Sequence, residues 1–168
     1  MKTITRSNIY LPMAAMILTA ALAVPVAAQK QVPFKGAMQG HDTVSPGPSP
    51  TTALLRTTAT GTGTLLGQFS FTQELTINGA NLTDTGSAQW IAANGDIIYT
   101  TVVGSAIPGD VVFTITEIHT ITGGTGRFSG AQGSFTVHRT HVVAPSDDGT
   151  HVTSGWFEGT ITSPGAAH

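Results

Sequence analysis

The sequence contains no cysteine in 168 residues, so disulfides cannot stabilise it and its stability must come from burial and backbone pairing. Charged residues make up only 10% of the chain, whereas 40% of it is hydrophobic. This balance is unlike that of disordered chains, which combine low hydrophobicity with high net charge. We therefore expect a compact fold without covalent cross-links.

Basic residues are also scarce, with seven Lys and Arg against nine Asp and Glu. Two of the seven, Lys2 and Arg6, lie in an N-terminal segment that reads as a signal peptide. The remainder of the chain then has five basic and nine acidic residues, a formal charge of −4. Such a chain has little with which to follow a phosphate backbone, and we predict no nucleic-acid partner.

Residues 1–28 have the three parts of a secretory signal. Lys2 and Arg6 precede the apolar run LPMAAMILTAALAVPVA, and Val26, Ala27 and Ala28 supply small residues for cleavage near Ala28. We predict a secreted or periplasmic protein, with a single domain over residues 29–168 and no membrane contact after cleavage. An uncleaved anchor is the alternative, because the run approaches the roughly 20 residues that a spanning helix needs.

Outside residues 1–28 the sequence has no sustained apolar stripe of helical period, so almost no helix is expected. Instead, apolar and polar residues alternate, as in the stretch QFSFTQELTIN. This pattern predicts an all-β fold, an eight-stranded antiparallel up-and-down barrel, with a sandwich as the alternative. The expected strands cover residues 32–41, 51–66, 68–78, 86–93, 97–104, 110–122, 131–143 and 151–162.

Turn residues mark the connections between these strands. Asn94-Gly95 between two β-prone runs predicts a hairpin. Three prolines within residues 42–50 predict a loop there, and Gly61 and Gly63 suggest a bend or bulge in their strand. Trp90, Tyr99, Trp156 and Phe157 are expected to fill the core, with the lining of a cavity as the alternative.

The glycine-rich stretch ITGGTGRFSGAQGSF is not a phosphate-binding loop, because a strand follows it where such loops need a helix. Glycine takes positive φ without steric cost, which suits a sharp reversal of the chain. We predict a structural corner in which Phe128 tucks beneath the core as a plug. The residues of this corner are Gly123, Gly124, Gly126, Phe128, Gly130 and Gly133.

The same stretch, extended to Val137, resembles the strand–turn–strand signature of the allene oxide cyclase and dirigent-like barrels. The similarity extends to uncharacterised secreted bacterial proteins of that barrel group, which share the start VPFKGAMQGHDT and the end ITSPGAAH. The resemblance implies an eight-stranded barrel with a central cavity. In allene oxide cyclases a glutamate near the first strand assists opening of a fatty-acid epoxide, whereas the first strand here carries Gln39, His41 and Asp42. Dirigent proteins use cavity aspartates and an arginine to steer phenoxy coupling, and sequence alone does not place their motifs on this chain.

Alternation along the strands predicts an internal polar network. Glu117 and His119 share a face with Val111, Phe113 and Ile115, which should point inward. Arg139 follows Phe135 and Val137 inward, and Gln73 lies among Phe69, Phe71 and Leu75. An inward carboxylate needs a partner, so Glu117 should pair with Arg139 or His119. The candidate ligand-cavity residues are Glu117, His119, Arg139, Gln73 and Phe113.

This network has two interpretations. It could orient a ligand, with Glu117 as a weak candidate for a catalytic acid or base, or it could be an inert polar plug at one end of the barrel.

No metal or cofactor is expected. His138 and His141 are three residues apart, which places them on opposite faces of a strand, and His41, His151 and His168 have no companion at ligand spacing. We expect these histidines to be solvated.

The sequence contains neither a nucleophile elbow nor a calcium loop, and Asp147-Asp148-Gly149 has the character of a turn.

The leading functional hypothesis is a secreted β-barrel that binds a small hydrophobic ligand in its cavity, with no catalysis implied by any motif. One alternative is an isomerase or cyclase that acts on a lipid or phenolic substrate. Another is a structural protein that self-assembles through its surface, since related barrels often form homo-oligomers. The supposed outer faces, rich in Thr and Ser, are suited to water rather than to lipid.

Overall fold

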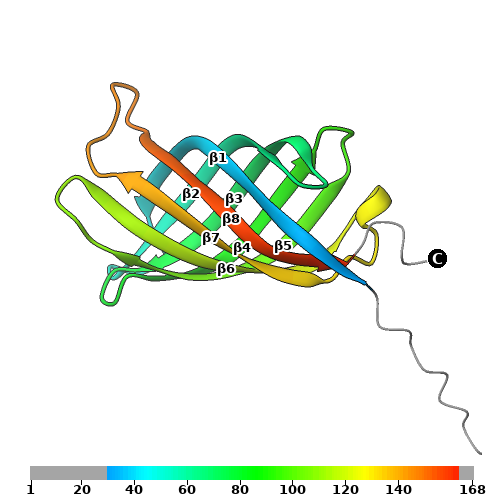
Figure 1. Ribbon diagram of the computed structural model, residues 1–168. Helices are drawn as coiled ribbons and strands as arrows, with labels where there is room; N and C mark the ends of the chain where they lie inside the picture. Colours follow the sequence, from blue (N-terminus) through cyan, green and yellow to red (C-terminus); the bar gives the residue numbers. More distant parts are fainter. Residues whose placement is uncertain (1–29, 163–168) are drawn as a thin grey trace, which may run out of the picture.

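The computed structural model describes residues 30–162, which form a closed barrel of eight antiparallel strands (Figure 1). The predicted signal peptide and the last six residues, 163–168, lie outside this described part. The elements are β1 (Gln31–Pro46), β2 (Thr52–Gly63), β3 (Gly67–Asn78), β4 (Thr83–Ala92), β5 (Ile97–Ile107), β6 (Val112–Gly124), the 3₁₀-helix η1 (Gly126–Phe128), β7 (Gly133–Val142) and β8 (His151–Thr162).

Each strand pairs with the next strand in the chain, and β8 closes the barrel by pairing with β1. The predicted all-β, eight-stranded up-and-down barrel is thus confirmed. Some of the connections are tight turns, as at Gly95, where φ is 87° and the Ala92 amide donates to the Asp96 carbonyl. Within residues 30–162, no helix is long and apolar enough to cross a membrane.

Two local predictions were wrong. The loop expected from residue 42 begins only after Pro46, because the prolines lie at 46, 48 and 50, and residues 42–45 retain the amides that pair β1 with β2. In β2, Gly61 and Gly63 pair with β3 in continuous register, without a bulge. These two glycines make room for the rings of Phe69 and Phe157, which a Cβ would meet at 2.7 and 2.9 Å.

Aromatic rings fill one half of the barrel. Phe34, Phe135 and Phe157 pack with ring centroids 4.9–5.6 Å apart, and the fully buried Trp90 lies against Phe135 and Phe157. Such edge and tilted contacts are favourable in addition to the area they bury. This half of the barrel is therefore filled by its own side chains.

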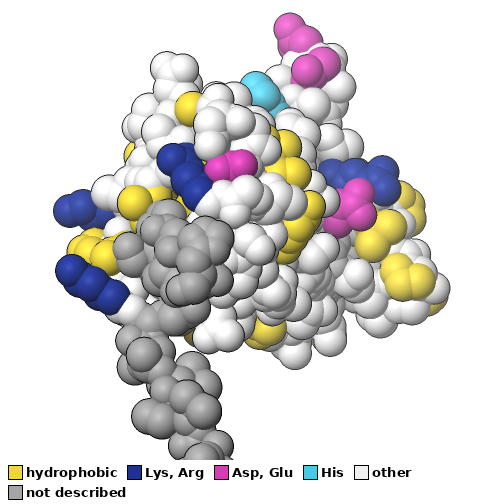
Figure 2. All heavy atoms as spheres, turned by 90° about the vertical axis from the view of Figure 1, so that its right-hand side faces the viewer, with side chains coloured by type: hydrophobic (Ala, Val, Ile, Leu, Met, Phe, Trp, Pro, Cys, Tyr) yellow, Lys and Arg dark blue, Asp and Glu magenta, His cyan; other side chains and the backbone are white. Residues whose placement is uncertain are grey.

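Phe128 closes the end of the barrel that the aromatic rings fill, as predicted. Its side chain is completely buried, and it lies in the short η1 within the glycine corner. Gly123 and Gly126 have φ of 145° and 52°, values that a residue with a Cβ adopts only with strain. Figure 2 looks onto this end, where a few basic and acidic side chains, some of them side by side, lie among mostly uncharged ones.

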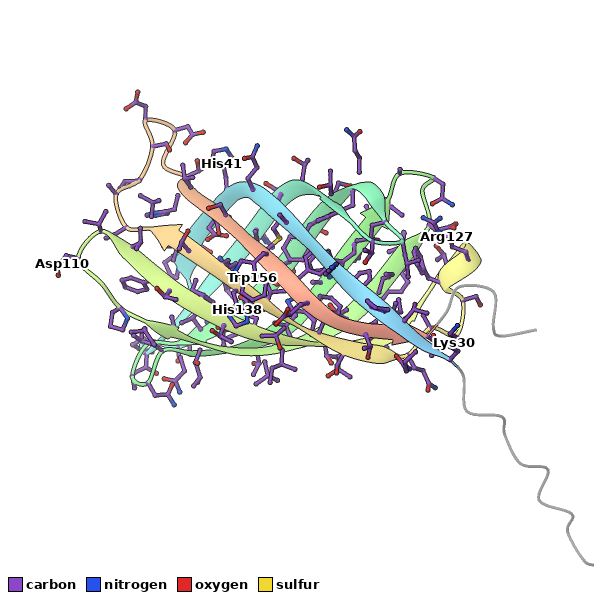
Figure 3. The ribbon with its side chains drawn as sticks, in the orientation of Figure 1. Lys30, His41, Asp110, Arg127, His138 and Trp156 are labelled. Atoms are coloured by element: carbon purple, nitrogen blue, oxygen red, sulfur yellow. The ribbon has the colours of Figure 1, made fainter. Side chains whose placement is uncertain are left out.

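Two aromatic residues expected in the core lie outside it. Tyr99 is 37% exposed and Trp156 is 46% exposed, because both occupy outward positions on their strands. Trp156 stacks on His138 with centroids 4.3 Å apart on the outer wall (Figure 3). Val111, assigned to the inward face, is 70% exposed because it lies in the loop before β6.

Candidate functional site

Arg139 on β7 is the centre of a buried polar cluster inside the barrel. Its Nη2 and Nε donate to Glu117 on β6, with an Nη2–Oε1 distance of 2.8 Å. Its Nη1 donates to Asp42 on β1 at 2.9 Å and to the Thr153 hydroxyl on β8 at 3.2 Å. One guanidinium thus ties together side chains from four strands, and the two carboxylates at its sides raise its pKa despite the opposing effect of burial.

Glu117 is fully buried and remains ionised. Burial alone would raise its pKa, but the charge of Arg139 and the hydrogen bonds around the carboxylate lower that pKa to about 2. Gln73 on β3 adds an amide donor, with Nε2 3.0 Å from Glu117 Oε1. At neutral pH Glu117 is therefore a fixed negative charge and an unsuitable proton donor.

Asp42 is a second buried carboxylate that sequence reasoning did not place in the site. His141 Nδ1 lies 2.7 Å from Asp42 Oδ2, and the Thr57 hydroxyl donates to Oδ1 at 2.6 Å. Burial works to raise the pKa of Asp42, but the hydrogen bond to His141, the charge of Arg139 and the Thr57 hydroxyl together lower it. The alternation that begins with Phe34 and Met38, if continued, places Asp42 on the inward face. This signal was missed because the predicted first strand ended at residue 41.

His119 lies on the aromatic side of the cluster. Its ring stacks on Phe135 at a centroid distance of 5.0 Å, and its Nδ1 is 3.0 Å from the Thr100 hydroxyl. The distance from Nε2 to Glu117 Oε2 is 3.8 Å, too long for a hydrogen bond. Burial lowers the pKa of His119, so its imidazole is neutral at physiological pH.

Asp84 on β4 is a third carboxyl group, and the one that is least satisfied. It is 5% exposed, and its Oδ1 is buried without a hydrogen-bond partner. Burial and the nearby charge of Glu117 raise its pKa to about 7, against a smaller lowering by Arg139. Sequence reasoning missed Asp84 because it began this strand at residue 86, whereas alternation with Ala88 and Trp90 places Asp84 inward.

A cavity of about 310 Å³ lies at the end of the barrel opposite η1. The polar side chains in its wall are Asp84, Arg139, His141 and His151. The remaining lining residues are apolar: Val44, Leu55, Leu75, Ile77, Leu82, Ala106, Phe113, Ile115 and Val143. The cavity therefore has apolar walls and a few polar groups.

Only some of the predicted cavity residues line the cavity. Arg139 and Phe113 line the cavity, whereas Glu117, His119 and Gln73 are fully buried and are not part of its wall. The structure brings Glu117, Arg139 and Gln73 into one hydrogen-bonded cluster, with His119 beside it. A role for any of them in binding a ligand stays a prediction.

One of two predictions about the histidines is confirmed by the structure. His138 points outward and His141 inward, which confirms that they lie on opposite faces. The expectation that His141 is solvated was wrong, because it is 9% exposed and bonded to Asp42. Its ring stacks on His151 at 4.5 Å.

Of three comparisons with known proteins, the one with solved structures supports the fold. No protein-family model matches the sequence. No curated protein matches it either. Among solved structures the chain is similar to one described as the pterocarpan synthase dirigent protein, with 14% sequence identity and a TM-score of 0.52 over 89% of this chain and 99% of that one. The fold is therefore a dirigent-like β-barrel, and the narrower similarity to secreted bacterial proteins stays a prediction.

Proposed function

We propose that this protein binds a small, largely apolar molecule in the cavity at the end of its barrel. The observation that carries the proposal is the cavity of about 310 Å³, whose largely apolar wall includes the carboxyl group of Asp84. Ligand sites are typically mostly apolar pockets of ~300–1,000 Å³ with a few polar groups that orient the ligand.

The architecture supports this location. Aromatic rings and Phe128 fill the other half of the barrel, so a ligand has its space at the open end. Arg139 and its carboxylate partners Asp42 and Glu117 form what we call the floor of the cavity. Their buried ion pairs hold this floor rigid, because the two carboxylates come from different strands. A rigid pocket loses less freedom on binding than one that must first become ordered.

Binding can be tested by isothermal titration calorimetry with octanol, a neutral probe with an apolar tail. Ala106 lines the cavity, so Ala106→Phe fills it and should weaken octanol binding at least about tenfold. The matched control is Ala37→Phe on the exposed outer face, which should bind octanol like the unaltered protein. Absence of octanol binding, or equal binding by both variants, would contradict the proposal.

A second candidate function is the direction or isomerisation of a lipid or phenolic substrate. Its support is Asp84, whose pKa of about 7 lets a cavity carboxyl both hold and release a proton at neutral pH. Asp84 meets this requirement better than Glu117, whose pKa is held at about 2. If a substrate is found, Asp84→Asn should lower kcat at least about 100-fold, and unchanged turnover would remove Asp84 from the mechanism.

We also propose that the protein is exported, supported by the signal-like sequence of residues 1–28. Intact mass spectrometry of the protein recovered from its own host tests this directly. Loss of the segment up to Ala28 is the expected result, and recovery of the full chain in the cell would contradict it.

A further inference from the structure

The floor of the cavity carries more carboxyl groups than cations. Arg139 is paired with both Asp42 and Glu117, so one positive charge already faces two negative ones. Asp84 adds a third carboxyl, whose Oδ1 is buried without a partner. In the cavity wall a ligand thus meets the carboxyl group of Asp84 and a guanidinium that is already paired with two carboxylates.

The donors of Arg139 are almost all occupied. A guanidinium has five N–H donors; here Nε donates to Glu117, Nη1 donates to Asp42 and Thr153, and Nη2 donates to Glu117. That leaves a single N–H for any other group. An anionic ligand would find this one donor while facing the carboxyl group of Asp84, with the charge of buried Glu117 nearby, so the cavity is poorly suited to anions.

The histidines at the cavity each direct Nδ1 to a group of the barrel itself. His151 Nδ1 lies 3.0 Å from the Val142 carbonyl oxygen, which can only accept, so Nδ1 donates. His141 Nδ1 lies 2.7 Å from Asp42 Oδ2. Neither Nδ1 is therefore left to donate to a ligand in the cavity.

A glycine lets Asp84 and Glu117 pack close to each other. Asp84 pairs with Gly104 on β5, and Gly104 pairs with Glu117 on β6, so the three occupy one row across neighbouring strands. A Cβ on Gly104 would lie 2.7 Å from both Asp84 Oδ1 and Glu117 Cγ. Because Gly104 has no side chain, both acidic side chains fit over its backbone, and the charge of Glu117 acts on Asp84.

Acidic side chains also lie on the outside of the barrel at the cavity end. Exposed Asp110 lies in the loop before β6, and exposed Asp147 and Asp148 lie in the loop before β8; both loops are at the cavity end (Figure 1). Figure 3 shows Lys30 and Arg127 at the opposite end of the barrel from Asp110. Such a separation of charge draws cations toward the cavity mouth and repels anions from it.

We propose that the cavity selects molecules with an apolar body and an ammonium head group, which donates hydrogen bonds to Asp84, and that it discriminates against carboxylates. This inference rests on the proposed binding function and adds the chemical class of the ligand. An ammonium group supplies three donors and a positive charge. It therefore complements the carboxyl group of Asp84 in the cavity wall, whose Oδ1 has no hydrogen-bond partner in the barrel and which no cation pairs.

The test compares three probes with the same tail and different heads: octylamine, octanol and octanoate. Calorimetry at pH 8 and low salt should show octylamine binding about tenfold more tightly than octanol, since a charge-assisted hydrogen bond is stronger than a neutral one. Octanoate should bind at least about tenfold more weakly than octanol, because Asp84 and Glu117 oppose its charge.

Two variants assign the selectivity to its residue. Asp84→Asn should reduce the octylamine-to-octanol affinity ratio about tenfold. Glu158→Gln, which removes the same charge from the exposed outer face of β8, should leave the ratio unchanged. The circular dichroism spectra of both variants should match that of the unaltered protein.

The outcomes separate this inference from the function on which it rests. If none of the three probes binds, the proposed binding function fails. If octanol binds but octylamine binds no better, or octanoate binds best, the cavity binds apolar molecules and the ammonium preference is overturned. An unchanged ratio in Asp84→Asn would likewise overturn the assignment to Asp84.

Discussion

Replacement of Asp84 by asparagine should stabilise the folded protein above about pH 4, and most strongly at neutral or alkaline pH. In an unfolded chain this carboxyl ionises near its usual pKa of 3.8, whereas in the barrel its pKa is about 7. Between these values folding takes up a proton, so Asp84 makes stability fall as pH rises. Below about pH 4 the carboxyl is protonated in both states and the effect vanishes.

The size of the effect follows from that pKa difference. About three pH units correspond to at most about 4 kcal/mol at pH 8. Because Asp84 borders a cavity that water can enter, we expect about half of that, ~2 kcal/mol, or a rise in Tm of about 6 °C.

Urea unfolding of Asp84→Asn at pH 8 and pH 4 measures the effect, with Asp110→Asn in an exposed loop as the matched control. Equal stability of Asp84→Asn and the unaltered protein at pH 8 would refute the reasoning.

Three further predictions concern the buried cluster and the plug. Arg139→Met should lower the free energy of unfolding by about 3–5 kcal/mol, because it leaves Asp42 and Glu117 without their cation. Urea titration at pH 7 measures this loss, and a variant as stable as the unaltered protein would show that the ion pairs are dispensable. Glu117 has its pKa lowered from 4.5 to about 2, so it stabilises the fold above pH 4.5 and loses that contribution as pH falls toward 2; acid unfolding of Glu117→Gln should therefore be less steep in this window than that of the unaltered protein. Phe128→Ala should cost about 3–5 kcal/mol and leave octanol binding intact, since Phe128 lies at the end opposite the cavity, and a lost binding site would contradict that separation.

Strand alternation gave the barrel and part of the site. The two-residue period of β3, β6 and β7 placed Gln73, Glu117, His119 and Arg139 inward, because in a closed barrel one face of every strand must be buried. The glycine corner before β7 was likewise readable, since glycine alone accepts its backbone angles at no cost.

The other half of the site escaped because its residues lie at strand ends. Asp42 was assigned to a loop by the prolines that follow it, and Asp84 precedes the apolar run by which β4 was recognised. His141 was separated from Asp42 by 99 positions in the sequence, and only closure of β8 onto β1 brings the two together. The pairing of distant strand ends is a property of the closed ring, and local pattern does not contain it.

The even number of strands has a practical consequence for work with this protein. Gln31 pairs with Thr162, so both ends of the described chain emerge together at the plugged end, beside Lys30 in Figure 3. A surface attachment made at Gln31 or at Thr162 is therefore held at the end of the barrel opposite the cavity. Immobilised through either of these two positions, the barrel has its cavity mouth facing the solution.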